Sequence, residues 1–120
     1  MATRIAIVGG LQRQERELAR LAEAAGYELL VHSGEMGGRG AAGLRALVAQ
    51  SDIVVIITGV NSHTAVQLAK KLSRQLGRTS VVHQRFSAAR FRALLDALTI
   101  HESHARWAGD GGAHAIAVGG

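Results

Sequence analysis

The chain has 120 residues, 48% of them hydrophobic and 3% aromatic, and it carries a formal net charge of +5. This length suits one domain with a single core and is too short for two. The absence of cysteine excludes disulfides, zinc–thiolate sites, iron–sulfur clusters and thioether-attached haem, and the longest apolar run, residues 53–57, is far too short to span a membrane.

In the first half of the chain, apolar spacing predicts two strands, a helix and a loop. Residues 4–8 are a short apolar run that ends at a glycine pair, which indicates a strand followed by a tight turn. Residues 18–25 place apolar side chains at helical spacing, and Gly26 then takes the usual position of a C-terminal glycine. Residues 28–31 form a second strand pattern. The next stretch, residues 33–43, has five glycines, so we expect an irregular, mobile loop there.

The second half of the chain continues the alternation of helices and strands. A short helix is predicted over residues 44–50. Residues 52–58 are almost continuously apolar and rich in β-branched side chains, which is typical of a central parallel strand covered on both faces. Residues 65–76 carry the apolar stripe of another helix, residues 79–83 form a fourth strand, and residues 91–98 supply the apolar face of a last helix.

This alternation predicts an α/β fold: a Rossmann-like three-layer sandwich with four parallel strands in the order 2-1-3-4. We expect the domain to span residues 1–99. The periodicity fades beyond it, and we interpret residues 100–120 as a histidine- and glycine-rich tail in which residues 115–118 could add a short strand. Open edge strands need cover, which favours a homodimer.

Three histidines follow three of the predicted strands. His32 ends the second strand, His63 lies in the first helical turn after the third, and His83 ends the fourth. Because parallel strands end at one edge of a sheet, we expect the three imidazoles along a common rim, beside the switch point where open α/β sheets bind ligands. A helix N-terminus disfavours the imidazolium, so His63 is the candidate metal ligand. The alternative is strand-end packing for His32 and His83 and a solvated cap position for His63.

Glycines, a serine and arginines accompany the histidines at this rim. Gly9 and Gly10 resemble a phosphate-binding turn, but the dinucleotide fingerprint lacks its third glycine, which argues against an NAD site. Asn61 or Ser62 is placed to cap the helix that follows the third strand. Arg39 and Arg85 could hold carboxylates or phosphates, or they could belong to a solvated basic face.

Short motifs in this chain, in their order and spacing, resemble those of a bacterial family called domain of unknown function 2325. The motifs are residues 5–10, 29–34 and 52–56, residues 60–63 followed by a Lys-Lys helix, and Arg85. The resemblance covers residues 4–98 and implies a Rossmann-like fold in a bacterial cytoplasmic protein. Some members look like small haem proteins that bind oxygen. His63 and His32 match the family's histidine positions, whereas His83 stands where relatives usually carry an apolar residue.

The resemblance makes a small cytoplasmic haem b protein, for gas binding or sensing, the leading expectation for the function. His63 would be the axial ligand, and Arg85 or Arg39 would meet the propionates. The alternative is a regulatory module that binds an anionic metabolite or nucleotide at the same crevice. A divalent metal held by all three histidines and nucleic-acid binding through the basic faces are further alternatives, although the few aromatic residues argue against a nucleic-acid partner. No acid–base pair is visible, so an enzyme is the least favoured class.

Overall fold

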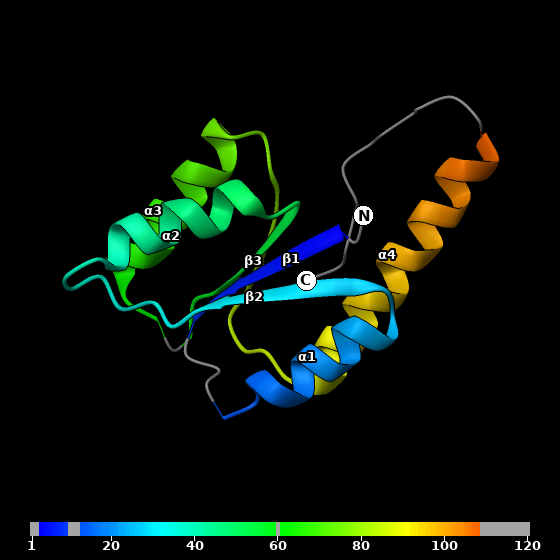
Figure 1. Cartoon of the computed structure of the whole chain (residues 1–120), viewed down its shortest axis with the longest axis horizontal. Helices are drawn as coiled ribbons and strands as arrows, with labels where there is room; N and C mark the ends of the chain where they lie inside the picture. Colours follow the sequence, from blue (N-terminus) through cyan, green and yellow to red (C-terminus); the bar gives the residue numbers. More distant parts are fainter. Residues whose placement is uncertain (1–2, 10–12, 60, 109–120) are drawn as a thin grey trace.

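The computed structural model describes residues 3–9, 13–59 and 61–108, which form an α/β sandwich around one parallel sheet (Figure 1). The strands are β1 (Thr3–Val8), β2 (Tyr27–His32), β3 (Ile53–Ile57) and β4 (Thr79–His83). The helices are α1 (Glu15–Ala24), α2 (Gly40–Gln50), α3 (His63–Gln75) and α4 (Ala88–Ala108). The sheet order is β2-β1-β3-β4 and every neighbouring pair is parallel, so the predicted fold class and strand order are confirmed.

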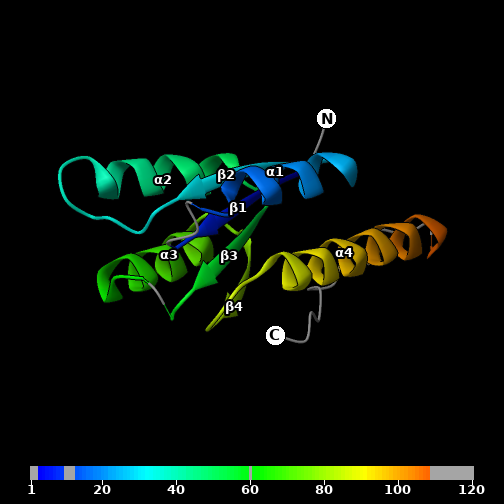
Figure 2. The ribbon, with the colours of Figure 1, turned by 90° about the horizontal axis from the view of Figure 1, so that it is seen from below.

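Two helices cover each face of the sheet. α2 and α3 lie on one face, and α1 and α4 lie on the other, as Figures 1 and 2 show. β3 is a central strand, and each of its residues is buried, as expected for a continuous β-branched run that is covered on both faces. β2 and β4 are the outer strands of the sheet, and Val82 on β4 is 43% exposed.

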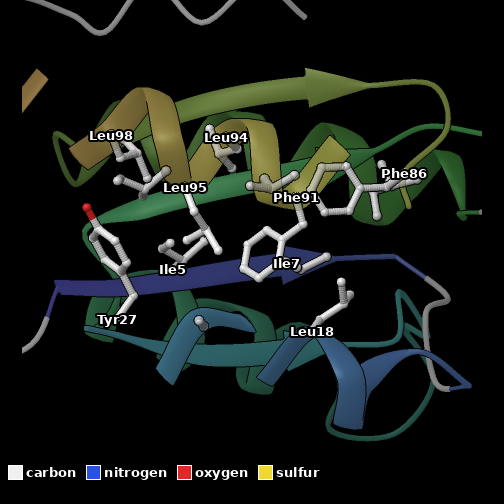
Figure 3. Close-up of a cluster of buried hydrophobic side chains, with 13 residues drawn as sticks. Ile5, Ile7, Leu18, Tyr27, Phe86, Phe91, Leu94, Leu95 and Leu98 are labelled. Atoms are coloured by element: carbon white, nitrogen blue, oxygen red, sulfur yellow. The ribbon is translucent and has the colours of Figure 1, made fainter. Parts of the chain in front are cut away.

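Alternating residues of the central strands supply two separate hydrophobic layers, because successive side chains of a strand point to opposite faces. Ile5 and Ile7 of β1 face α1 and α4, whereas Ala6 and Val8 face α2 and α3. Figure 3 shows the first layer, in which apolar side chains of α4 lie over Ile5 and Ile7. Phe91 is fully buried there, and complete burial of a side chain of this size contributes roughly 1.5–3 kcal/mol.

Helix α2 begins earlier than the sequence predicts. An irregular loop is expected over residues 33–43, but the helix already starts at Gly40. A Cβ atom on Gly40 would overlap the carbonyl oxygen of Glu35, and a Cβ atom on Gly43 would lie 3.9 Å from the His32 ring. Gly40 therefore allows the first turn of α2 to pack closely on the preceding loop, whereas Gly43 leaves room for an ordinary van der Waals contact with His32 of β2. This packing overrides the low helix propensity of glycine.

Helix α4 continues past the predicted end of the domain. The apolar periodicity ends near Thr99, yet the helix extends to Ala108, and Figure 2 shows its last turns projecting beyond the sheet. Ile100 on this projection is 69% exposed. The rest of the predicted tail, with the possible strand over residues 115–118, lies outside the described residues. Although α4 has 21 residues, neither it nor another described helix is apolar enough to cross a membrane.

Candidate functional site

The candidate site lies at the carboxyl ends of β1 and β3, the neighbouring strands between which the chain order reverses. Gly9 directly follows β1 with φ +148°, and a Cβ atom on it would lie 2.9 Å from the Cβ atom of Ile57. Only glycine therefore lets the turn after β1 pass this close to β3. The Gly9 amide donates a 2.9 Å hydrogen bond to the His32 carbonyl oxygen, which extends the β1–β2 ladder into the turn. Gly10, the second glycine of the predicted turn, lies outside the described residues.

Asn61 joins the two strands at this point, a role that its place in the sequence did not predict. Its side-chain nitrogen donates to the carbonyl oxygens of Val8, at 3.2 Å, and Ile57, at 2.8 Å. Its Oδ1 atom is buried beside Gly34 and has no hydrogen-bond partner in the described part of the chain. A Cβ atom on Gly34 would overlap this oxygen, so the loop after β2 needs glycine at that position. Asn61 thereby holds β1, β3 and the loop after β2 in one arrangement.

Ser62 fixes the beginning of α3, as predicted for a helix cap. Its hydroxyl accepts a 3.1 Å hydrogen bond from the Ala65 amide and donates a 2.9 Å hydrogen bond to the Gly34 carbonyl oxygen. His63 is the first residue of the helix, and its side chain and that of Thr64 are exposed. The amides of His63 and Thr64 lie in the first turn, where a helix offers no intrahelical acceptor. The start of α3 is thus held by the hydrogen bonds of Ser62, and its first amides have no acceptor within the helix.

His32 is engaged by backbone groups on both sides of its ring. Nδ1 accepts a 3.0 Å hydrogen bond from the Gly34 amide, so Nε2 carries the proton and donates to the Gly40 carbonyl oxygen, also at 3.0 Å. The ring is therefore neutral, and it pins the loop after β2 to the first turn of α2. His32 pairs in register with Val8, which places its side chain on the α2 and α3 face. With both nitrogens occupied, the side chain stabilises the loop and offers no free ligand atom.

His83 lies on the opposite face of the sheet. It pairs with Ile57, and its ring packs against Phe86 with 5.3 Å between the ring centroids. The side chain is 7% exposed, and within the described ranges neither ring nitrogen has a hydrogen-bond partner. Burial, and to a smaller extent the nearby charge of Arg90, lowers the pKa of His83 from 6.5. The ring is therefore neutral at pH 7.

The structure does not bring the three histidines together, so the prediction of a common rim of imidazoles is wrong. His32 and His83 lie on opposite faces and on the two outer strands, which three strand spacings separate by roughly 14 Å. Among the described side chains, no three histidine or carboxylate groups could hold a metal ion, which contradicts the predicted three-histidine metal site. His63 is exposed at the start of α3, and its role as an axial haem ligand stays a prediction.

Two of the candidate arginines lie at the same edge of the sheet as the site. Arg39 lies at the N-cap position of α2 and Arg85 follows β4, and both are exposed on either side of the switch point. The first turns of α2, α3 and α4 contain no acidic residue, in contrast to α1, which begins with Glu15 and Glu17. Glu35 adds one exposed carboxylate to the loop after β2. Helix N-termini and arginines together favour an anion at this edge.

Comparison with known proteins identifies a family but no characterised relative. Neither a curated protein nor a solved structure matches the chain. The model of a family described as "Uncharacterized protein conserved in bacteria (DUF2325)" matches residues 4–98, which include β1 except its first residue, β3, Asn61, Ser62 and the first half of α4. This match confirms the family that the sequence motifs resemble. The chain therefore belongs to this family of uncharacterized bacterial proteins.

Proposed function

We propose that this protein is a binding module for a small phosphate-bearing metabolite, held at the carboxyl ends of β1 and β3. The observation that carries the proposal is the fixed start of α3. Asn61 ties it to the ends of β1 and β3, and Ser62 ties it to the loop after β2. The backbone donors of His63 and Thr64 are thus held in place before a ligand arrives. Such preorganisation lowers the entropy lost on binding.

The electrostatics of this edge support an anion as the ligand. A helix N-terminus stabilises a nearby negative charge by about 0.3–1 kcal/mol at an exposed site, and phosphate groups commonly occupy helix N-termini in α/β folds. Arg39 and Arg85 add exposed guanidinium groups on the two flanks, and guanidinium binds phosphate in a two-pronged geometry.

A matched pair of variants on α3 tests the proposal. Calorimetric titration with pyrophosphate and with adenosine monophosphate should show binding to the native protein. His63→Glu places a carboxylate at the start of the helix and should weaken binding by about tenfold or more, equivalent to about 1.4 kcal/mol. Gln75→Glu makes the same charge change at the other end of the same helix, at an exposed position, and should leave the affinity within about twofold.

Two results would contradict the proposal of a ligand site at the start of α3. If neither phosphate compound binds, or if His63→Glu and Gln75→Glu weaken binding equally, the start of α3 is not the ligand site. Thermal unfolding of both variants provides the control for folding. A carboxylate at a helix N-terminus is favourable, so His63→Glu should melt at or above the temperature of the native protein.

Haem binding, which the family resemblance implies, stays a prediction. The measurement is the visible absorption spectrum of the full chain titrated with hemin. Stoichiometric uptake with a Soret band that disappears in His63→Ala would support axial ligation by His63. A spectrum that shows only free hemin would remove this expectation and leave the proposal of an anion site unaffected.

A further inference from the structure

Charge is distributed unequally between the two helical layers of the molecule. Neither α2 nor α3 contains an aspartate or glutamate, and the sequence has no acidic residue between Asp52 and Asp96. On the other side of the sheet, α1 carries three glutamates beside two arginines. The net positive charge of the protein is therefore concentrated on the layer formed by α2 and α3. Figure 1 shows this layer on the side of the sheet opposite α1 and α4.

The basic residues of this layer are exposed and span both helices. They are Arg39, Arg45, Lys70, Lys71 and Arg74. Lys70 and Arg74 are four residues apart and thus neighbours on one face of α3, with about 6 Å between them along the helix axis. A hollow of about 370 Å³ lies between the helices, lined by Arg45, Leu68 and alanines of α2. Because alanine side chains are small, a partner can approach the α2 backbone closely.

We propose that the outer face of α2 and α3, here called the basic face, docks onto the phosphate backbone of a double-helical nucleic acid. α2 and α3 expose lysines and arginines and contain no carboxylate, so their charge is complementary to the regularly spaced phosphates of a duplex. Neutralising phosphates releases counterions, and this release supplies most of the affinity of contacts that do not depend on base sequence. Arg39 lies at the border between the basic face and the proposed metabolite site. Lys70 and Arg74, which the test below changes, lie in the middle and last turns of α3, so this inference does not depend on the proposed metabolite site.

The described side chains favour a duplex over a single strand or a membrane surface. Binding of single strands relies on aromatic rings that stack on the bases, and Tyr27, Phe86 and Phe91, the aromatic residues among the described side chains, are buried. Helices that bind membrane surfaces insert large apolar side chains. Among the described residues, the large apolar side chains that are exposed are Leu76, Val82 and Ile100, and of these Leu76 alone adjoins the basic face, as the C-cap of α3. The basic face therefore offers charge without stacking platforms or apolar anchors.

The test measures binding of the full chain to a labelled duplex of about two helical turns, near 20 base pairs, in two unrelated sequences. Titration across several salt concentrations should give a slope of log K against log salt near −2.7 or steeper, because at least three phosphate contacts contribute about −0.9 each. The double variant Lys70→Glu with Arg74→Glu should weaken binding by about thirtyfold or more. The milder pair Lys70→Gln with Arg74→Gln should make the slope less steep by about 2.

Arg16→Glu with Arg20→Glu is the matched control, because these exposed arginines are also four residues apart, on α1. Each pair changes the net charge by −4, from +5 to +1, so the overall charge is the same in both variants. The control should lose no more than about threefold in affinity. Equal loss in both pairs would mean that net charge alone drives binding, and would overturn the proposal. Tighter binding to a single strand, or binding to phosphatidylserine vesicles without binding to the duplex, would overturn it as well.

Discussion

Replacing Gly34 with alanine should destabilise the fold far more than the same replacement elsewhere in its loop. Gly34 is buried with φ +94°, and a Cβ atom there would overlap Oδ1 of Asn61. The added methyl group therefore has two effects. It forces an L residue into a left-handed conformation, and it displaces the side chain that bonds the ends of β1 and β3.

The loss in the free energy of unfolding is the sum of these two effects. The left-handed conformation costs roughly 1–2 kcal/mol. Displacing Asn61 loses its hydrogen bonds to the Val8 and Ile57 carbonyl oxygens, at about 1 kcal/mol each. Gly34→Ala should thus lower the free energy of unfolding by about 3–4 kcal/mol. The melting temperature should fall by about 12–16 °C, at about 4 °C per kcal/mol for a domain of this size.

Two further variants separate the cost of the backbone conformation from the contact between Gly34 and Asn61. Gly38 lies in the same loop with φ +61°, and an added Cβ atom there meets nothing within 4 Å, so Gly38→Ala should cost only the roughly 1–2 kcal/mol of conformation. Asn61→Ala removes the overlapping atom as well as the two hydrogen bonds. Gly34→Ala with Asn61→Ala should therefore be about as stable as Gly34→Ala alone, a coupling of about 2 kcal/mol in urea unfolding. Additive losses, or equal losses for Gly34→Ala and Gly38→Ala, would show that the two residues do not act through this contact.

Three other substitutions test separate features. Burial and, to a smaller extent, the charge of Arg90 lower the pKa of His83 below 6.5 in the folded protein. As the pH falls, His83 therefore binds a proton in the unfolded chain before it does in the folded chain. The free energy of unfolding should thus decrease as the pH falls below about 6.5. His83→Leu should remove this part of the pH dependence in urea midpoints measured at several pH values, and an unchanged profile would contradict the assignment. Arg78 donates to the Ala49 carbonyl oxygen at 2.8 Å and to that of Val48 at 3.4 Å, so Arg78→Ala should cost about 1 kcal/mol in thermal unfolding. Ser62→Ala should cost about 0.5–2 kcal/mol as a lost cap, and no measurable loss would mean that the two hydrogen bonds of Ser62 are replaced by water.

The sequence predicts the architecture well where one physical signal dominates. The run in β3 has no polar side chain and is β-branched, which is typical of a strand covered on both faces. Gly26 and Gly77 end helices with φ +86° and +66°, conformations that favour glycine. The predicted helix boundaries are wrong where tertiary contacts determine where a helix begins or ends. Gly40 enters α2 because packing requires it, and α4 projects past the sheet, where no apolar period exists to be detected.

The candidate site was only partly predictable, because its key contacts join residues that are distant in sequence. The cap at Ser62 follows from local pattern, but its hydrogen bond to Gly34 spans 28 positions. The shared edge of the strands suggested that the histidines would meet. Side-chain alternation instead sends His32 and His83 to opposite faces, and strand register, which a single sequence does not reveal, determines this.

The hydrogen bond from the Gly9 amide to the His32 carbonyl oxygen, beyond the ends of β1 and β2, has a counterpart beyond the ends of β3 and β4. There the Thr58 amide donates to the His83 carbonyl oxygen and the Gly59 amide to the Gln84 carbonyl oxygen, both at 2.8 Å. The ladder therefore runs past the strand ends into the turns on both flanks. Amide hydrogen exchange at these turn residues should be as slow as in the central strands, since they open only together with the sheet. A ligand at this edge would meet a surface that needs no refolding, so its association rate should be limited by diffusion and charge rather than by loop closure.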